Sequence, residues 1–306
     1  MIFSLLMIKR IVLFLLTNIA VIAVVSVLLS LFHIGSYITP YGIDVRALLI
    51  FATLFGFVGS FISLFLSKWM AKRAYGVRII TSPQNTEEAF LIQTVQILAE
   101  RAGIAMPEVG VYMSPEVNAF ATGWNKNNAL VAVSEGLLEH MEKNEAEGVL
   151  GHEISHIANG DMVTMALLQG VVNTFVIFFA RIAAYIVQSF VNRGNEDEGN
   201  VGGFVYYAVS FLFEILFGVL ASIIVMWFSR YREYRADAGS AHLWGNPQKM
   251  IFALKRLEAL EGKLPVDERS SALKTMKIND KSALFSLFSS HPSIKERIDA
   301  LQKGSI

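Results

Sequence analysis

The chain has 306 residues, of which 54% are hydrophobic and only 17% are charged, and its formal net charge at pH 7 is zero. Soluble domains average about 25% charged residues, so this composition indicates a membrane protein with a soluble part. The absence of cysteine excludes disulfides, thiol catalysis and cysteine-ligated zinc. The sequence has no basic block and no phosphate-binding glycine motif, and so gives no support for a nucleic-acid or nucleotide partner.

Two uncharged apolar stretches near the start of the chain predict membrane-spanning helices. Residues 11–32 and 47–67 are each long enough to cross a hydrocarbon layer of about 30 Å. The first follows two basic residues, as a signal sequence would, but it lacks a clear cleavage site and is expected to remain as an anchor. Gly56 and Gly59 in the second stretch predict close helix packing.

Two short apolar runs, residues 109–113 and 129–133, predict strands. Between them lies the segment 118–123. We expect its first residues to offer an exposed strand edge that pairs with the backbone of a peptide substrate, with Asn118 forming a hydrogen bond to it and Phe120 beside it. The alternative is an ordinary loop in which Phe120 is buried in the core.

A helix is predicted to end at Asn159-Gly160, a pair that breaks helices. Apolar residues recur before this point at helical spacing. At its start, Asn144 and Glu147 have the spacing of a capping box, so we expect Asn144 to be the N-cap.

This helix carries the motif His-Glu-x-x-His. His152 and His156 are four residues apart, so both imidazoles leave one face and can share a metal ion. Glu153 is rotated by about 100° from His152, near the metal but free to act on water. The alternative is a chance match on a surface helix.

The next two apolar stretches, residues 162–191 and 201–228, predict a second membrane hairpin. Arg181 and Glu214 would lie within it at similar depth, and we expect them to pair with each other or to face a polar cavity, because unpaired charges in a membrane are costly. One alternative is that Arg181 extends to the outer interface. Another is that the hairpin packs on the soluble part without crossing fully.

A catalytic zinc ion takes three protein ligands and leaves one position for water, so a third ligand is needed. Glu233 and Asp237 share one face of a helix predicted to continue from the last span. One can bind the metal while the other accepts a hydrogen bond from a ligand histidine. We favour Glu233 over Asp237 or His242, the alternative being an exposed helix with Arg–Glu and Arg–Asp pairs.

The remaining histidines are not expected to bind the metal directly. His291 begins a predicted amphipathic C-terminal helix, where we expect it to pack or to support the site. His140 and His242 are expected to be surface or structural residues. Residues 263–282 mix charge with serine and threonine and predict a loop.

Basic residues flank the spans asymmetrically and predict the topology. Lysine and arginine cluster before the first span, after the second and after the fourth, whereas the loop at residues 192–200 is acidic. Both termini and the metal motif are therefore expected in the cytoplasm.

Four segments, residues 118–123, 150–156, 232–238 and 290–293, are together similar to the HtpX family, membrane zinc proteases of bacterial quality control that are related to CAAX prenyl proteases. The resemblance covers essentially the whole chain. It implies a mainly α integral membrane protein with four transmembrane helices and a cytoplasmic zincin-like α+β metalloprotease domain containing a small sheet. It also implies one zinc ion per chain, with Glu233 as third ligand and Glu153 as general base.

We accordingly expect four segments in chain order. These are an N-terminal transmembrane hairpin (1–67), a cytoplasmic protease part (68–161), a second hairpin (162–228) and a cytoplasmic helical part with the third ligand (229–306).

The expected activity is hydrolysis of peptide bonds in misfolded or damaged membrane proteins at the cytoplasmic face of the bacterial inner membrane under stress. Tyr231, Tyr234 or Arg235 would share the oxyanion charge. The alternative function is a non-catalytic, zinc-stabilised scaffold or chaperone. Cleavage of prenylated peptides would need a lipid-sized chamber, for which four spans are too few.

Overall fold

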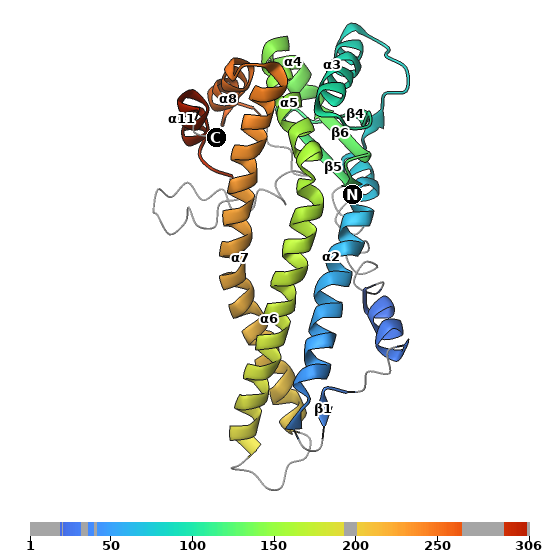
Figure 1. Cartoon of the computed structure of the whole chain (residues 1–306), viewed down its shortest axis with the longest axis vertical. Helices are drawn as coiled ribbons and strands as arrows, with labels where there is room; N and C mark the ends of the chain where they lie inside the picture. Colours follow the sequence, from blue (N-terminus) through green and yellow to red (C-terminus); the bar gives the residue numbers. More distant parts are fainter. Residues whose placement is uncertain are drawn as a thin grey trace. The chain divides into compact units, whose positions relative to one another are not determined.

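The computed structural model describes residue 19 and residues 21–31, 36–39, 42–192, 201–264 and 291–304. The chain divides into two compact units, which we call the apolar unit (Met1–Ser63 and Met165–Val225) and the sheet unit (Leu64–Thr164 and Met226–Ile306). Three long helices have residues in both units: α2 (Val45–Tyr75), α6 (Asp161–Asn192) and α7 (Val201–Trp244) (Figure 1).

Among the described residues, three segments are long and apolar enough to cross a membrane: Val45–Tyr75, Asp161–Val191 and Val205–Trp244. The first two contain the second and third predicted spans, and the third contains all but the first four residues of the fourth. A shorter apolar helix, Val21–Leu31, lies within the first predicted span, and the rest of that span falls almost entirely outside the described residues. Two two-residue strands, β1 (Ile38–Thr39) and β2 (Gly42–Ile43), form a small antiparallel pair before α2.

Of the two glycines that were predicted to allow close helix packing, Gly56 does so in the apolar unit and Gly59 does not. A Cβ on Gly56 would lie 2.5 Å from Thr174 Oγ1 and 2.7 Å from Gly170 O, so only glycine allows α2 and α6 to approach this closely. At Gly59 a Cβ would make only ordinary contacts, 4.0 Å from Val21.

Arg181 and Glu214 form an ion pair between α6 and α7, with 3.0 Å between Nη2 and Oε1. The predicted pairing is therefore confirmed. Glu214 and Asn173 also line a cavity of about 310 Å³ in this unit, whose other lining residues are apolar or glycine.

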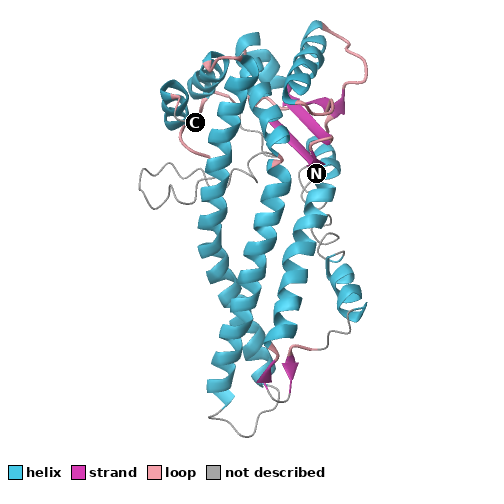
Figure 2. Ribbon diagram, in the orientation of Figure 1, coloured by secondary structure: helices cyan, strands magenta, loops and turns pink. Residues whose placement is uncertain are grey.

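The sheet unit is built on a four-stranded sheet in the order β3-β4-β6-β5. The strands are β3 (Arg78–Ile79), β4 (Glu108–Tyr112), β5 (Ala119–Asn125) and β6 (Asn128–Ser134). β4 and β6 are the two predicted strands, each displaced by no more than one residue, and they pair in parallel, whereas the other neighbours are antiparallel. The segment predicted to offer a strand edge forms most of β5, which lies at the edge of the sheet (Figure 2).

The described residues of this unit also form the helices α3 (Thr86–Ala102), α4 (Glu135–His140), α5 (Lys143–Asn159), α8 (Gln248–Leu260) and α11 (Ile294–Lys303). The main core joins one apolar face of α3 and one of α5 to the sheet. Its buried members include Leu91, Val95, Val131, Leu150 and Ile154. α5 is the motif helix, and the core holds its apolar face against the sheet.

The predicted N-cap of α5 is wrong. The helix begins two residues earlier, with Glu142 as N-cap, and Glu142 N donates to Glu145 Oε2 at 2.8 Å in a capping box. Glu147, the expected capping partner, instead binds Lys249 on α8 through its carboxylate. The predicted end is confirmed, because Gly160 caps the helix with φ of 68°.

The predicted C-terminal helix is α11, in which Ser293 is the N-cap and shares a capping box with Glu296. Its apolar face packs on α8 through Ile298 and Leu301. The predicted loops at residues 192–200 and 263–282 lie, apart from their first residues, outside the described residues.

Candidate metal centre

Small residues let α5 and α7 pack closely where the site forms. A Cβ on Gly239 would lie 2.5 Å from Ser155 Oγ, and one on Gly151 would lie 2.5 Å from Ser240 Oγ. Ser240 Oγ also donates to Gly148 O at 2.9 Å, which fixes the crossing point. Because the helix axes approach so closely, a side chain on α7 can reach the histidines on α5.

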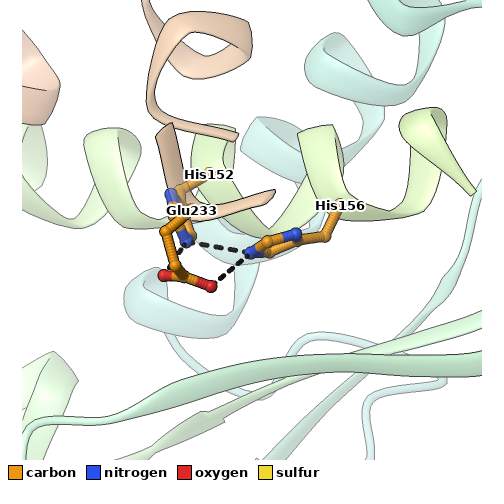
Figure 3. A group of neighbouring side chains, drawn as sticks. All are labelled: His152, His156 and Glu233. Carbon is orange, nitrogen blue, oxygen red and sulfur yellow. Dashed lines mark hydrogen bonds and ion pairs between the residues drawn. The ribbon is translucent and has the colours of Figure 1, made fainter. Parts of the chain in front are cut away.

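His152, His156 and Glu233 meet at this crossing (Figure 3). The Nε2 atoms of the two histidines are 3.1 Å apart, and the Glu233 oxygens lie 3.5 Å from His152 Nε2 and 3.4 Å from His156 Nε2. A tetrahedral ion with ligand bonds of about 2.0–2.1 Å holds neighbouring donor atoms about 3.3 Å apart. Each Nε2 therefore has its own Glu233 oxygen at the spacing of neighbouring ligands, and one atom from each of the three residues lies within 4.8 Å of the others, close enough to share one small divalent cation.

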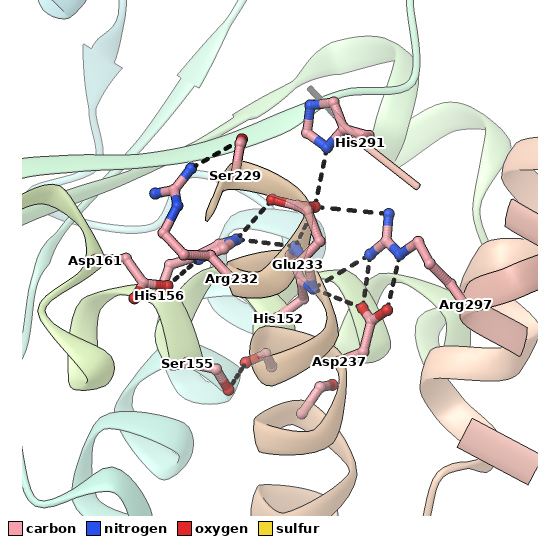
Figure 4. Close-up of polar contacts among 12 residues, drawn as sticks. His152, Ser155, His156, Asp161, Ser229, Arg232, Glu233, Asp237, His291 and Arg297 are labelled. Carbon is pink, nitrogen blue, oxygen red and sulfur yellow. Dashed lines mark hydrogen bonds and ion pairs between the residues drawn. The ribbon is translucent and has the colours of Figure 1, made fainter. Parts of the chain in front are cut away.

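Two carboxylates orient the imidazoles from behind (Figure 4). His152 Nδ1 donates to Asp237 Oδ1 at 2.9 Å, and His156 Nδ1 donates to Asp161 Oδ2 at 2.6 Å. Because each Nδ1 donates to a carboxylate, Nε2 is the ring nitrogen that faces the site and would bind a cation in exchange for its proton. Asp237 is thus the predicted hydrogen-bond partner of a ligand histidine, and it does not approach as a third donor.

Arg297 on α11 holds Asp237 in turn. Its Nε and Nη2 donate to the two Asp237 oxygens at 2.7 and 2.6 Å, a bidentate pair, and its Nη1 lies 3.7 Å from Glu233 Oε2. Asp237 is fully buried and Arg297 nearly so. The C-terminal helix therefore completes the site, although sixty residues separate the two partners.

The electrostatics of the group follow from burial and close pairing. Burial alone raises the pKa of Glu233, but hydrogen bonds from His152, His156 and His291 outweigh it and hold that pKa well below its usual range. Burial lowers the pKa of His152, yet its bonds with Asp237 and Glu233 raise it to about 10. Glu233 is therefore a carboxylate, the form that binds a cation.

A cavity of about 210 Å³ opens beside the three donor atoms. Glu153, Asn118 and Ala119 contribute to its lining, together with His291. His291 Nδ1 lies 3.0 Å from Glu233 Oε2, and the histidine side chain is 63% exposed. Of the predicted residues, Glu153, Asn118 and His291 therefore lie at the cavity, and His291 contacts a donor residue as expected of a supporting group.

Two predicted residues lie elsewhere. Phe120 packs in an aromatic cluster with Tyr75 and Tyr112, with ring centroids 5.1 and 5.6 Å away, which is the core alternative. Arg235 donates to Asn159 at the end of α5, with 3.4 Å between Nη2 and Oδ1. Arg235 and Phe120 are absent from the cavity lining in the described part of the chain.

The other expected alternatives for ligands and oxyanion stabilisers also lie apart from the donor atoms. His242 is exposed in the last turn of α7, and Tyr231 is half exposed and stacks on Trp227. His140 is structural, since its Nδ1 lies 2.9 Å from Gly136 O within α4. Glu233 is therefore the α7 residue whose carboxylate lies close to the Nε2 atoms of both histidines.

Sequence reasoning missed Asp161 and Arg297. Asp161 directly follows the glycine that ends α5, so the turn carries it back to His156. The signal that could have found it is an acidic residue at the first position after a motif helix. Arg297 offers a weaker signal, a basic residue on the otherwise apolar face of a short helix beside Ile298 and Leu301.

Comparison with known proteins identifies what this chain resembles. Residues 85–305 match the model of peptidase family M48. The chain is 53% identical over 300 residues to the Protease HtpX homolog of Methylacidiphilum infernorum, covering 97% of this chain and 99% of that protein. It is 54% identical over 295 residues to Protease HtpX of Aeromonas hydrophila subsp. hydrophila, covering 96% and 99%.

The fold is also similar to a solved structure. The crystal structure of Ste24p from S. mikatae superposes with a TM-score of 0.68 at 22% identity. The match covers 96% of this chain and 65% of that one. At this identity the likeness concerns the fold alone.

Proposed function

The chain belongs to peptidase family M48, and from this premise we propose that it is a membrane-embedded zinc endopeptidase. It hydrolyses peptide bonds of misfolded or damaged membrane proteins at the cytoplasmic face of the bacterial inner membrane, as part of the response to stress. The observation that carries the proposal is the convergence of two imidazole nitrogens, 3.1 Å apart, and the Glu233 carboxylate, whose two oxygens lie 3.5 and 3.4 Å from them, at the close crossing of α5 and α7. The name Protease HtpX of its relatives supports it.

The donor set suits zinc. Two imidazoles and one carboxylate leave a fourth position for water, which is the composition of catalytic zinc sites. His152, His156 and Glu233 would hold one ion per chain, and Asp237 and Asp161 would keep both imidazoles in the required tautomer. When bound, zinc supplies a Lewis acid that polarises the scissile carbonyl and activates water.

Glu153 is the proposed general base. It follows a donor histidine directly and lines the cavity in which a substrate carbonyl and the attacking water would meet. In this role it takes the proton from the attacking water and passes it to the leaving amine.

The cavity suggests how a peptide lies there. Asn118 and Ala119, at the start of the edge strand β5, share the lining with His152 and Glu153. An extended peptide would pair with β5 through backbone hydrogen bonds, which tolerate many side-chain sequences. This suits a protease that removes damaged proteins of varied sequence.

The basic residues in the last part of α2 and along the later part of α7 support a cytoplasmic position for both termini and the site. The chain has no cysteine, so single cysteines introduced on either side can be tested with a membrane-impermeant maleimide in intact cells. Labelling from outside at a residue of the sheet unit would contradict this orientation.

The experiment that tests the activity is Glu153→Gln in the purified full chain. We expect one zinc ion per chain by mass spectrometry in wild type and variant, and a loss of casein cleavage of about 10²–10⁴-fold in the variant. Glu147→Gln is the matched control on the same helix, because Glu147 binds Lys249 away from the cavity. Undiminished cleavage by Glu153→Gln would exclude Glu153 as the base.

The same experiment distinguishes the protease from the scaffold alternative. A structural zinc site closes with a fourth protein ligand, whereas the group in the described residues has three. If the wild type binds zinc tightly but cleaves neither casein nor a membrane substrate, the protein is a scaffold.

A further inference from the structure

One face of the sheet lies along the last part of α2, within the sheet unit. Phe120 on β5 contacts Tyr75, with ring centroids 5.1 Å apart. Four residues further along β5, Trp124 contacts Phe65, with centroids 5.8 Å apart. β5 therefore follows α2 from its C-terminal end back toward its apolar run.

The sequence of α2 marks where that run meets water. It is uncharged from residue 47 to residue 67, and Lys68 and Trp69 follow. Tryptophan and lysine are typical of the membrane–water interface. Trp69 is 49% exposed, with the Arg73 guanidinium 5.7 Å from its ring centroid. Phe65 lies three residues, or about 4.5 Å of helix rise, on the membrane side of Lys68.

Ion pairs and hydrogen bonds fix the sheet at this level. Lys68 Nζ donates to Asn128 Oδ1 at 2.8 Å and lies 3.0 Å from Glu108 Oε1. Asn128 begins β6 and Glu108 begins β4, so the ends of two strands are tied to the helix turn at the interface. Lys72 also pairs with Glu108.

The tip of the β5–β6 hairpin has the composition of an interfacial segment. Trp124 is 40% exposed and Phe65 58% exposed, so the two touching rings together present apolar surface. Beyond them the turn is polar, and Lys126 is exposed. At a bilayer surface the Trp124 indole would lie beside hydrocarbon and Lys126 would lie among the lipid headgroups. In water the rings of Trp124 and Phe65 would instead form an exposed apolar patch.

The outer edge of β5 links this tip to the metal group. β5 is the last strand of the sheet, and among the described residues no strand pairs with its outer edge. Ala119 at its start lines the cavity with His152 and Glu153. Five residue steps separate Ala119 from Trp124, about 17 Å of extended strand.

We propose that the tip of the β5–β6 hairpin contacts the lipid surface, and that the free edge of β5 leads a substrate segment from that surface to the metal group. The second half of this inference rests on the proposed protease function. It implies that peptide bonds about five to seven residues from the cytoplasmic end of a transmembrane segment are cut preferentially, since that length of extended chain spans about 17 Å.

The lipid contact can be tested without any proteolysis. Because the chain has no cysteine, Lys126→Cys carries a single spin label at the hairpin tip. Its accessibility to oxygen and to a water-soluble nickel complex is measured in nanodiscs of phosphatidylcholine with 30% phosphatidylglycerol. The matched control is Glu135→Cys, an exposed position directly after the other end of β6.

We expect the label at 126 to show the higher ratio of oxygen to nickel accessibility, as at a membrane interface, and the label at 135 to behave as in water. Equal, water-like ratios at both positions would overturn the lipid contact, whatever the enzyme cleaves. A variant that fails to fold is recognised by the loss of its native line shape. If Lys126→Cys does so, Asn127→Cys provides a second position at the tip.

The position of the cut tests the guiding edge. Single-span substrates carry the same cleavable sequence 2, 6, 12 or 20 residues from the transmembrane segment, and the products are located by mass spectrometry. We expect the 6-residue substrate to be cut at least about fivefold faster than the 20-residue one in bilayers, and this preference to shrink in Trp124→Ser while casein cleavage changes less than twofold.

Equal rates for all four substrates, with casein cleaved normally, would overturn the guiding role. Absence of casein cleavage by the wild type would instead overturn the proposed function, and the accessibility measurement would still decide the lipid contact. The two failures are therefore distinguishable.

Discussion

The metal group of the sheet unit and the Arg181–Glu214 pair of the apolar unit both place charged side chains among apolar ones, but they differ in how many partners each charge has. Asp237 accepts two hydrogen bonds from Arg297 and one from His152, all in a buried setting. Arg181 and Glu214 make one 3.0 Å contact, and their side chains are 18% and 31% exposed.

This difference indicates what each set of charges does. A network in which a buried charge has several partners holds its members in one geometry, which metal ligands need. A single pair links two helices but fixes each side chain through one contact only. We therefore expect changes in the first region to alter metal binding and changes in the second to alter stability alone.

The largest expected effect follows from removing the third ligand. Glu233→Ala should lose the metal and with it all detectable casein cleavage, because two imidazoles alone bind zinc weakly. Metal content per chain is measured after dialysis against a weak chelator, with Glu214→Ala as the carboxylate control from the other region. Retention of one zinc ion by Glu233→Ala would assign the third ligand to another residue.

Removing Arg297 should have the next largest effect. Arg297→Ala leaves Asp237 buried without its bidentate partner, and breaking a buried pair costs about 3–5 kcal/mol. Zinc affinity should fall about 10–100-fold, since Asp237 then no longer fixes His152. Competition with a fluorescent chelator measures this change.

Arg297→Lys sharpens the same comparison. Lysine restores the charge but not the fork of two parallel hydrogen bonds, so zinc affinity should be intermediate. If Arg297→Ala melts at a lower temperature yet binds zinc as tightly as the wild type, Arg297 supports the fold and does not position the ligand.

Breaking the pair in the apolar unit should cost much less. The double-mutant cycle of Arg181→Gln and Glu214→Gln is expected to give a coupling energy of about 0.6 kcal/mol, and no more than about 1.7 kcal/mol, as for other polar contacts between membrane helices. Unfolding in detergent mixtures measures it. Casein cleavage should stay within about twofold of wild type, and a loss as large as that of Arg297→Ala would remove the contrast between the regions.

The smallest effect is expected at the start of α11. Ser293→Ala removes the side chain that accepts a hydrogen bond from Glu296 N, a change of about 1 kcal/mol. Hydrogen exchange in the first turn of α11 should accelerate, with zinc affinity reduced less than threefold because Arg297 lies in the next turn. Ser293→Asp keeps a cap and should behave as wild type, so faster exchange there would show that capping is not the cause.

Several features could be predicted because their cause lies within one element. His152 and His156 face one way through helical spacing alone, and three apolar segments follow from composition and length. The strands β4 and β6 follow from short apolar runs. The N-cap of α5 was mispredicted because two capping boxes are possible in this stretch. The structure uses Glu142 and Glu145, whereas the prediction used Asn144 and Glu147.

The sequence by itself determined which atoms could bind a metal: a helical histidine pair and a carboxylate on a later helix, with no cysteine to compete. Only the tertiary structure decided that Gly151 and Gly239 bring α5 and α7 close enough for the three donors to meet, and that Arg297 and Asp161 support them. It also decided that Phe120 turns to the core and Trp124 to the end of the apolar run of α2. The physical reason is range: helical periodicity acts over a few residues, whereas contacts between residues 60 and 85 positions apart depend on how whole elements pack.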